Sequence, residues 1–321
     1  MKKRSFLKLA SMSLVLPSFD QAIGQTLAPG PIRVIVPLGP GTANDLDGRL
    51  LTTKVGSNTG QAFVIDNRPG ANGVIATMAV VRAKPDGQTL LFSSNSALAT
   101  NVALVKGLPY DPLRELTPIA GGSITPTCVI VKASSPYKTL PELLVAARRS
   151  PGKITFGYGS SFVQVQVASM NTTAGVSLMP VPFKTTGDAV AGVLASVVDM
   201  TITDPGNAIA MAKGGQARIL AVTSLNRSAS LPDVPAVAET VAGHDFIAWA
   251  ALVGPAGMPR DLVERLGNAV REAQKDPEVI EKLRDGARAP LVMGPDELKA
   301  FMAAEVHKWQ GLVRDANIQP T

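Results

Sequence analysis

The chain has 321 residues, of which 45% are hydrophobic and 17% are charged, so it can bury a substantial core in about two domains. Its formal net charge is +6, but four basic residues and one acidic residue lie in the first 24 positions, which leaves +3 for the rest. Because the part after residue 24 has no run of Lys or Arg and no basic stripe with interleaved aromatic residues, it predicts no nucleic-acid partner.

The first 24 residues have the order of a signal peptide. The basic run Lys2-Lys3-Arg4 is followed by an apolar stretch, Leu9 to Leu16, and by small residues at Ala22 and Gly24. We therefore predict that residues 1–24 are removed and that the rest is periplasmic. The stretch around Arg4 is similar to a twin-arginine signal with Lys in place of the first Arg, so that route and ordinary secretion both stay open. The apolar stretch is far shorter than the roughly 20 residues that span a bilayer.

Short β-type runs alternate with helical patterns over most of the remaining chain. The predicted strands are 33–36, 62–65, 89–92, 129–131, 154–156, 198–203 and 219–222. Apolar residues at helix spacing then predict two long helices, over 262–273 and 298–313. This order predicts an α/β fold with mostly parallel sheets.

No low-complexity linker divides the chain, so we expect two α/β lobes that are joined by crossing strands. The α/β alternation is interrupted near 121–127 and again near 245–251, just before the helical tail. We predict that residues 26–124 begin lobe 1, that 125–247 form lobe 2, and that 248–321 return to lobe 1.

The segment from Val34 to Leu51 predicts a strand, a Gly/Pro turn and a helix capped by Thr42, Asn44 or Asp45. The first turn of a helix has unpaired amides and the positive end of its dipole, so it attracts anions. The glycine spacing matches neither a dinucleotide fingerprint nor a P-loop. A plain strand-to-helix turn is the alternative interpretation.

Two later loops have the same design, one over 156–162 and one over 183–188, each with small residues and hydroxyls before a helical pattern. If two lobes face each other across a cleft, these three helix starts converge on it. The pattern therefore favours binding of a small anion by mainly neutral groups, with Thr42 and Ser160 facing the cleft from opposite lobes.

The sequence offers few residues for catalysis. Cys128 is the only cysteine and lies in an apolar run, while His244 and His307 are far from it and from each other. There is no nucleophile elbow and no His-Glu-x-x-His motif, and we expect neither a metal nor another cofactor. An enzyme that uses carboxylates such as Asp45 and Asp204 on a small carboxylate is the alternative.

From about Pro31 to Ile318 the chain resembles the Bug-type receptors of tripartite tricarboxylate transporters. The matching stretches are Ile35 to Pro37 with Pro40-Gly41 and Asp45, Asp66 to Gly73, Pro85 to Leu91, Leu108 to Asp111, Leu220 to Ser224, Leu231 to Pro235, Gly254 to Gly257 and Glu305 to Trp309. The resemblance implies a type II periplasmic-binding-protein fold whose lobes close around one small carboxylate. It also implies transporter membrane subunits or a sensor protein as partner; we expect a monomer. An effector domain of a transcription regulator shares this fold, but no helix-turn-helix pattern precedes Pro31.

Carried onto this sequence, the resemblance implies a ligand site with residues from both lobes. Its predicted residues are Leu38, Gly39, Gly41, Thr42, Asp45, Ser94 and Asn95 in lobe 1, and Tyr158, Ser160, Ser161, Thr185 and Asp204 in lobe 2. Asp204 either accepts from an amine or hydroxyl of the ligand or orders its own loop.

The sequence departs from the family's pattern at several of these positions. Thr42 stands where a second Gly is usual, the loop from Tyr158 to Ser161 is shortened and lacks a His, and Phe183 replaces a usual Tyr. With Phe162, these residues predict a less polar pocket for a ligand with an apolar or aromatic body and one carboxylate. Packing of Tyr158 or Phe162 into the core is the alternative.

Overall fold

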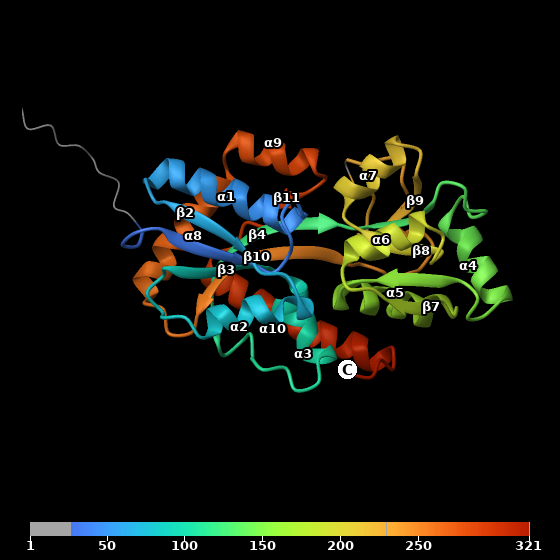
Figure 1. Ribbon diagram of the computed structural model, residues 1–321, viewed down its shortest axis with the longest axis horizontal. Helices are drawn as coiled ribbons and strands as arrows, with labels where there is room; N and C mark the ends of the chain where they lie inside the picture. The colour runs from blue at the N-terminus through green and yellow to red at the C-terminus, as the bar shows by residue number, and fades with distance from the viewer. Residues whose placement is uncertain (1–26, 229, 321) are drawn as a thin grey trace, which may run out of the picture.

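The computed structural model describes residues 27–228 and 230–320, which form two β-sheets flanked by helices (Figure 1). The predicted signal segment lies outside the described residues. The α/β architecture predicted from the sequence is confirmed. Within the described ranges, none of the helices combines the length and the apolar character that crossing a bilayer requires.

The first sheet has six strands in the order β11-β4-β10-β3-β1-β2. β1 is parallel to β2 and β3, whereas β10 is antiparallel to β3 and β4, and β11 is antiparallel to β4. The strands are β1 (Ile32–Val36), β2 (Phe63–Asn67), β3 (Thr89–Ser94), β4 (Leu116–Pro126), β10 (Ile247–Pro255) and β11 (Ala289–Pro290).

The second sheet has five strands in the order β7-β6-β8-β5-β9. They are β5 (Cys128–Lys132), β6 (Thr155–Tyr158), β7 (Met179–Pro182), β8 (Met200–Thr203) and β9 (Ala217–Val222). β6 is parallel to β7 and β8, but β5 is antiparallel to β8 and β9. The expectation of mostly parallel sheets is therefore wrong. Both sheets are mixed because β4, β5 and β10 carry the chain between the sheets instead of returning through a helical crossover.

Helices cover both faces of the first sheet, and we call this unit the first lobe. On one face α1 (Ala43–Thr59), α8 (Arg260–Gln274) and α9 (Pro277–Asp285) share a core with β1 and β3. On the other lie α2 (Val74–Val81), α3 (Asn101–Leu104) and α10 (Pro295–Asp315), with the short turns η1 (Ala71–Gly73) and η2 (Ser96–Thr100). The two long C-terminal helices predicted from apolar spacing are confirmed as α8 and α10.

The second sheet and its helices form the second lobe. α4 (Leu140–Arg149) and α5 (Ser161–Ala174) pack on one face, and α6 (Thr186–Leu194) and α7 (Pro205–Lys213) pack on the other. The turn η3 (Val237–Glu239) lies between β9 and β10. Cys128 is fully buried on the α6 and α7 face.

The two strand connections between the lobes are hydrogen-bonded to each other. Thr127 alone separates β4 from β5, and its amide donates to Oγ1 of Thr223 at 3.0 Å. That hydroxyl in turn donates to the carbonyl oxygen of Phe246, just before β10, at 2.8 Å. All three residues are buried, so the two crossings form one ordered junction.

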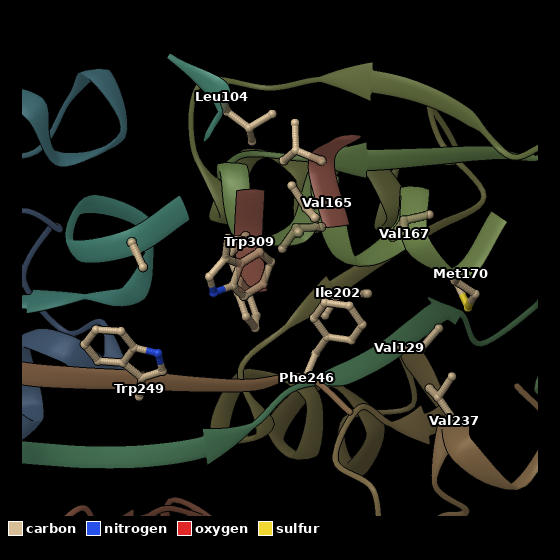
Figure 2. Packing of buried hydrophobic residues seen from close by; sticks show 14 of the residues in the cluster. Leu104, Val129, Val165, Val167, Met170, Ile202, Val237, Phe246, Trp249 and Trp309 are labelled. Atoms are coloured by element: carbon tan, nitrogen blue, oxygen red, sulfur yellow. The ribbon is translucent and has the colours of Figure 1, made fainter. Parts of the chain in front are cut away.

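An aromatic cluster fills the core beside this junction. Trp309 of α10 lies next to Phe246 in Figure 2, with ring centroids 5.6 Å apart, and it also contacts Phe162 of α5 at 5.5 Å. The indole N–H groups of Trp249 and Trp309 both donate to Oε2 of Glu305, at 2.8 and 3.0 Å. One continuous core therefore joins the lobes on the α5 and α10 side.

Candidate functional site

The start of α1 is built by hydrogen bonds within its own loop. Thr42 is the N-cap; its hydroxyl donates to the carbonyl oxygen of Gly39 at 2.8 Å and accepts from the amide of Asp45 at 3.4 Å. The carbonyl oxygen of Leu38 accepts from the Asn67 side chain at 2.9 Å, and the Leu38 side chain is exposed. The Thr42 hydroxyl therefore fixes the shape of the loop.

Asp45 is a buried carboxylate that holds this loop together. It accepts from the amide of Gly41 at 2.9 Å, from Nδ2 of Asn67 at 2.9 Å and from Nε of Arg49 at 3.0 Å. Burial alone would raise the pKa of the Asp45 carboxyl, but the hydrogen bonds from Arg49, Gly41 and Asn67 outweigh it and lower the pKa below its usual value. Asp45 thus acts on a ligand through the loop it orders.

Asn44 is a buried polar residue that the sequence prediction of the site left out. Its side-chain oxygen and nitrogen both lack a hydrogen-bond partner among the described residues, although only 6% of the residue is exposed. Gly48, one turn later on the same face of α1, lies over Phe92 of β3 and Val36 of β1. Asn44 therefore lies beyond the carboxyl ends of these two strands, where α/β sheets place ligands.

The end of β3 supplies the other predicted residues of the first lobe. Ser94 is half-buried at the last position of the strand, and Asn95 is buried just after it. Nδ2 of Asn95 has no partner within the described part of the chain. An unpaired buried amide costs about 1–3 kcal/mol, so these groups are suited to bind a polar ligand.

In the second lobe the loops before α5 and α6 are in direct contact. The amide of Phe183 donates to the carbonyl oxygen of Tyr158 at 2.8 Å. A Cβ at Gly159 would overlap the backbone of Thr185, so glycine is required there. Ser160 and Thr185 are the N-caps of α5 and α6, as their helix-start patterns indicated. The two loops therefore form one surface of the second lobe.

Other residues of these loops are used within the protein. The hydroxyl of Ser161 donates to Oδ1 of Asn101 in the first lobe at 3.1 Å, and both residues are buried. Phe162 packs against Trp309, so the alternative of core packing holds for it. Phe183 lies against Gly157 and Gly192. Of the aromatic residues expected around the ligand, Tyr158 alone is not used in such packing. It is half-buried beside Phe156.

The starts of α1 and α7 meet at one cavity of about 160 Å³. Asp204 is the N-cap of α7; it accepts from the Asn207 amide at 3.0 Å and from Nδ2 of Asn207 at 2.6 Å. The cavity contains two of the predicted site residues, one from each lobe. It is lined by Gly41, Ala43, Leu46, Asp204, Pro205, Gly206, Asn207, Gly286 and Arg288.

Arg288 adds a positive charge to this cavity from a distant part of the sequence. Its Nη1 donates to the carbonyl oxygen of Ala43 at 3.2 Å and forms an ion pair with Asp47, whose other oxygen accepts from the hydroxyl of Ser123. Burial raises the pKa of the Asp47 carboxyl to about 6, against the opposing effects of Arg288 and Ser123. Sequence reasoning missed Arg288 because it follows Ala43 by 245 residues and belongs to no motif.

A larger cavity of about 330 Å³ lies at the outer end of the second lobe. Lys132, Ala133, Ser134, Leu194, Gly215 and Gln216 line it. No residue of the predicted site is among them, and all six belong to one lobe. The cavity between α1 and α7 is therefore the better candidate for the ligand site.

Cys128 and His244 are buried, whereas His307 is exposed on α10. Burial raises the pKa of the Cys128 thiol to about 12, which disfavours a thiolate nucleophile. His244 is buried against Phe246, with ring centroids 4.6 Å apart, and burial lowers its pKa to about 4. Neither residue lines the cavity between the lobes.

Comparison with known proteins identifies the family. The family model described as "Tripartite tricarboxylate transporter family receptor" matches residues 48–318. A UPF0065 protein of Bordetella bronchiseptica is 32% identical over 314 residues, which cover 98% of this chain and 93% of that protein.

Two solved structures are similar over nearly their whole length. R. palustris Rpa4515 with adipate has a TM-score of 0.86 and 27% identity, and the match covers 91% of this chain and 99% of that one. The periplasmic binding protein BugD has a TM-score of 0.83 and 26% identity, with the same coverage of both chains.

The two-lobed fold and the Bug-type resemblance are thereby confirmed. The family model spans most of the chain, and the structural matches extend over both lobes. The chain belongs to the tripartite tricarboxylate transporter receptor family and is a solute-binding protein, not an enzyme.

Proposed function

We propose that this protein captures a small carboxylate in the cleft between its lobes, in the periplasm, and delivers it to the membrane subunits of a tripartite transporter. The observation that supports this most is the cavity lined by the first turns of α1 and α7, which belong to different lobes. Both turns present the positive end of a helix dipole, which favours a carboxylate.

The ligand site in this proposal includes loop amides and buried polar side chains. In the first lobe, Gly39, Gly41 and Thr42 form the turn before α1, and Asn44 and Asn95 supply unpaired side-chain amides. In the second lobe, Thr185 and Asp204 cap the helices α6 and α7. Asp45, Ser160 and Ser161 hold these loops in shape through hydrogen bonds within the protein.

The lobes would close by rotating about the junction of Thr127, Thr223 and Phe246. The continuous core on the α5 and α10 side keeps the lobes together there, while the opposite side holds the cavity. We propose residues 27–126 with 247–320 as one moving unit and 128–222 as the other, in a monomer.

Isothermal titration calorimetry of the purified exported protein tests the proposal. The panel begins with straight-chain dicarboxylates, because the similar R. palustris protein was solved with adipate, and includes benzoate-like monoacids for the apolar pocket expected from the sequence. A ligand at 100 times its Kd should stabilise the protein by about 2.7 kcal/mol. Failure of every carboxylate to bind would contradict the proposal.

A second test concerns export and delivery. Sequencing the N-terminus of the periplasmic protein should show a start near residue 25, since the segment before it has the signal-peptide order. Uptake of the bound carboxylate by cells should require this chain together with the membrane subunits. Uptake that persists without the chain would contradict the delivery step.

A further inference from the structure

Two opposite charges line the cavity between α1 and α7, one from each lobe. Arg288 comes from the first lobe, after α9, and Asp204 comes from the second lobe, at the start of α7. The other lining residues carry no charge. A ligand held there meets a fixed cation on one side and a fixed anion on the other.

Arg288 is held in place with part of its guanidinium unused. Its side chain is only 9% exposed, and Nη1 is bound by Asp47 and by the carbonyl oxygen of Ala43. Nε is buried without an acceptor among the described residues, and Nη2 donates to none of them either. Five N–H donors in a rigid fork match a carboxylate, so the free edge is suited to bind one.

Gly286 gives the guanidinium its space. A Cβ at this position would overlap Nε and Nη2 of Arg288, so any side chain at 286 would push the guanidinium away. Gly286 also lines the cavity. The Gly286–Arg288 segment and the Asp47 ion pair thus position the group on both sides.

Asp204 has acceptor capacity left after capping its helix. Its Oδ1 accepts one hydrogen bond from the backbone amide of Asn207, and its Oδ2 accepts one from the side-chain amide of the same residue. An ionised carboxylate offers about four lone-pair sites, so both oxygens can accept again. A ligand that presents only carboxylates would leave this acid facing a like charge.

This inference rests on the proposed function. We propose that Arg288 binds the carboxylate of the ligand and that Asp204 binds a hydroxyl or ammonium group on the carbon next to that carboxylate. The ligand class is then a 2-hydroxy or 2-amino carboxylate. Neutral helix starts alone would bind any small acid. The charged pair adds a requirement for a donor on the ligand.

Calorimetry with succinate, malate and aspartate tests this, because the three share a four-carbon skeleton and differ at C2. A hydrogen bond to a charged group contributes about 1.5–3 kcal/mol, so malate or aspartate should bind roughly ten- to hundredfold more tightly than succinate. Asp204→Asn keeps a helix cap but removes the charge. It should abolish a preference for aspartate, and should only reduce one for malate because an amide oxygen still accepts from a hydroxyl.

Asp276→Asn is the matched control, since Asp276 also caps a helix but lies at the start of α9. It should leave all three affinities unchanged. Arg288→Lys keeps the charge opposite Asp47 and should weaken the binding of all three carboxylates. Gly286→Ala, which displaces the guanidinium without removing it, should do the same.

Two results would overturn the inference. In one, the protein binds other carboxylates but does not prefer malate or aspartate to succinate; if no carboxylate binds at all, the proposed function fails with it. In the other, Asp204→Asn and Arg288→Lys change the ligand-free dimensions in X-ray scattering but not the affinity ratios. The pair would then be a latch between the lobes.

Discussion

The starts of α1 and α5 look alike in the sequence but differ in what their side chains contact. Both are rich in small and hydroxylated residues, and both have a hydroxyl N-cap, Thr42 or Ser160. At α1, Asn44 is buried with no partner in the described structure. At α5, Ser161 is bonded across the lobes and Phe162 is inside the core. A polar helix start thus serves a ligand only where tertiary contacts leave its groups free.

The largest effect on this comparison is expected from Phe162→Ala. Removing a buried ring that packs on Trp309 should lower the free energy of unfolding by about 3–5 kcal/mol. Urea denaturation followed by circular dichroism measures it. Val145→Ala, on the exposed side of α4, is the control and should have little effect. A loss below about 1 kcal/mol would show that the start of α5 is not held by the core.

The second effect concerns pH and the same aromatic cluster. His244 packs against Phe246, and burial lowers its pKa from 6.5 to about 4, so the unfolded chain binds more protons between these values. Its contribution to stability is present above pH 6.5 and is lost as the pH falls toward 4, by roughly 3 kcal/mol. Melting of the protein and of His244→Phe across this range measures it. Equal pH slopes for the two proteins would refute the assignment.

Ser161→Ala should have a smaller effect, about 1–3 kcal/mol of stability, because Oδ1 of the buried Asn101 loses its donor. Thr172→Ala on the same helix is the control, since that hydroxyl bonds only to its own helix and is exposed. Ligand affinity measured on the folded variant should change little. A selective loss of affinity with unchanged stability would return Ser161 to the ligand site.

The smallest effect on stability is expected from Asn44→Ala. The substitution removes two unpaired buried polar atoms, so the free energy of unfolding should stay within about 0.5 kcal/mol or rise. Affinity for the carboxylate found by calorimetry should fall. Thr52→Ala, further along α1 and bonded to the carbonyl oxygen of Gly48, is the control for affinity. Unchanged affinity in Asn44→Ala would remove Asn44 from the site.

Local features of the fold could be predicted from the sequence, and long-range ones could not. The helix start after Val36 and the apolar stripes of α8 and α10 depend on neighbours within one or two turns, and they are confirmed, with Thr42 as the N-cap among the three candidates. The antiparallel entry of β10 depends on strands that are far apart in the chain, and the parallel expectation was wrong there.

The same division applies to the candidate site. Asn44 could have been found from its four-residue spacing to Gly48, which places both on the sheet-facing side of α1. Arg288 could not, because its partners Ala43 and Asp47 come from the other end of the chain. Nothing in the local sequence around Ser161 indicates Asn101 as its partner.

The shared carboxylate of Glu305 gives the protein a built-in optical reporter. The chain has two tryptophans, and both donate to the same oxygen of Glu305. Trp309 also touches Phe162, which belongs to the second lobe, so the indoles sit where the lobes meet. Tryptophan fluorescence, excited selectively over the three tyrosines, therefore samples this one region, and a shift in its emission on adding a solute would follow movement between the lobes without any attached label.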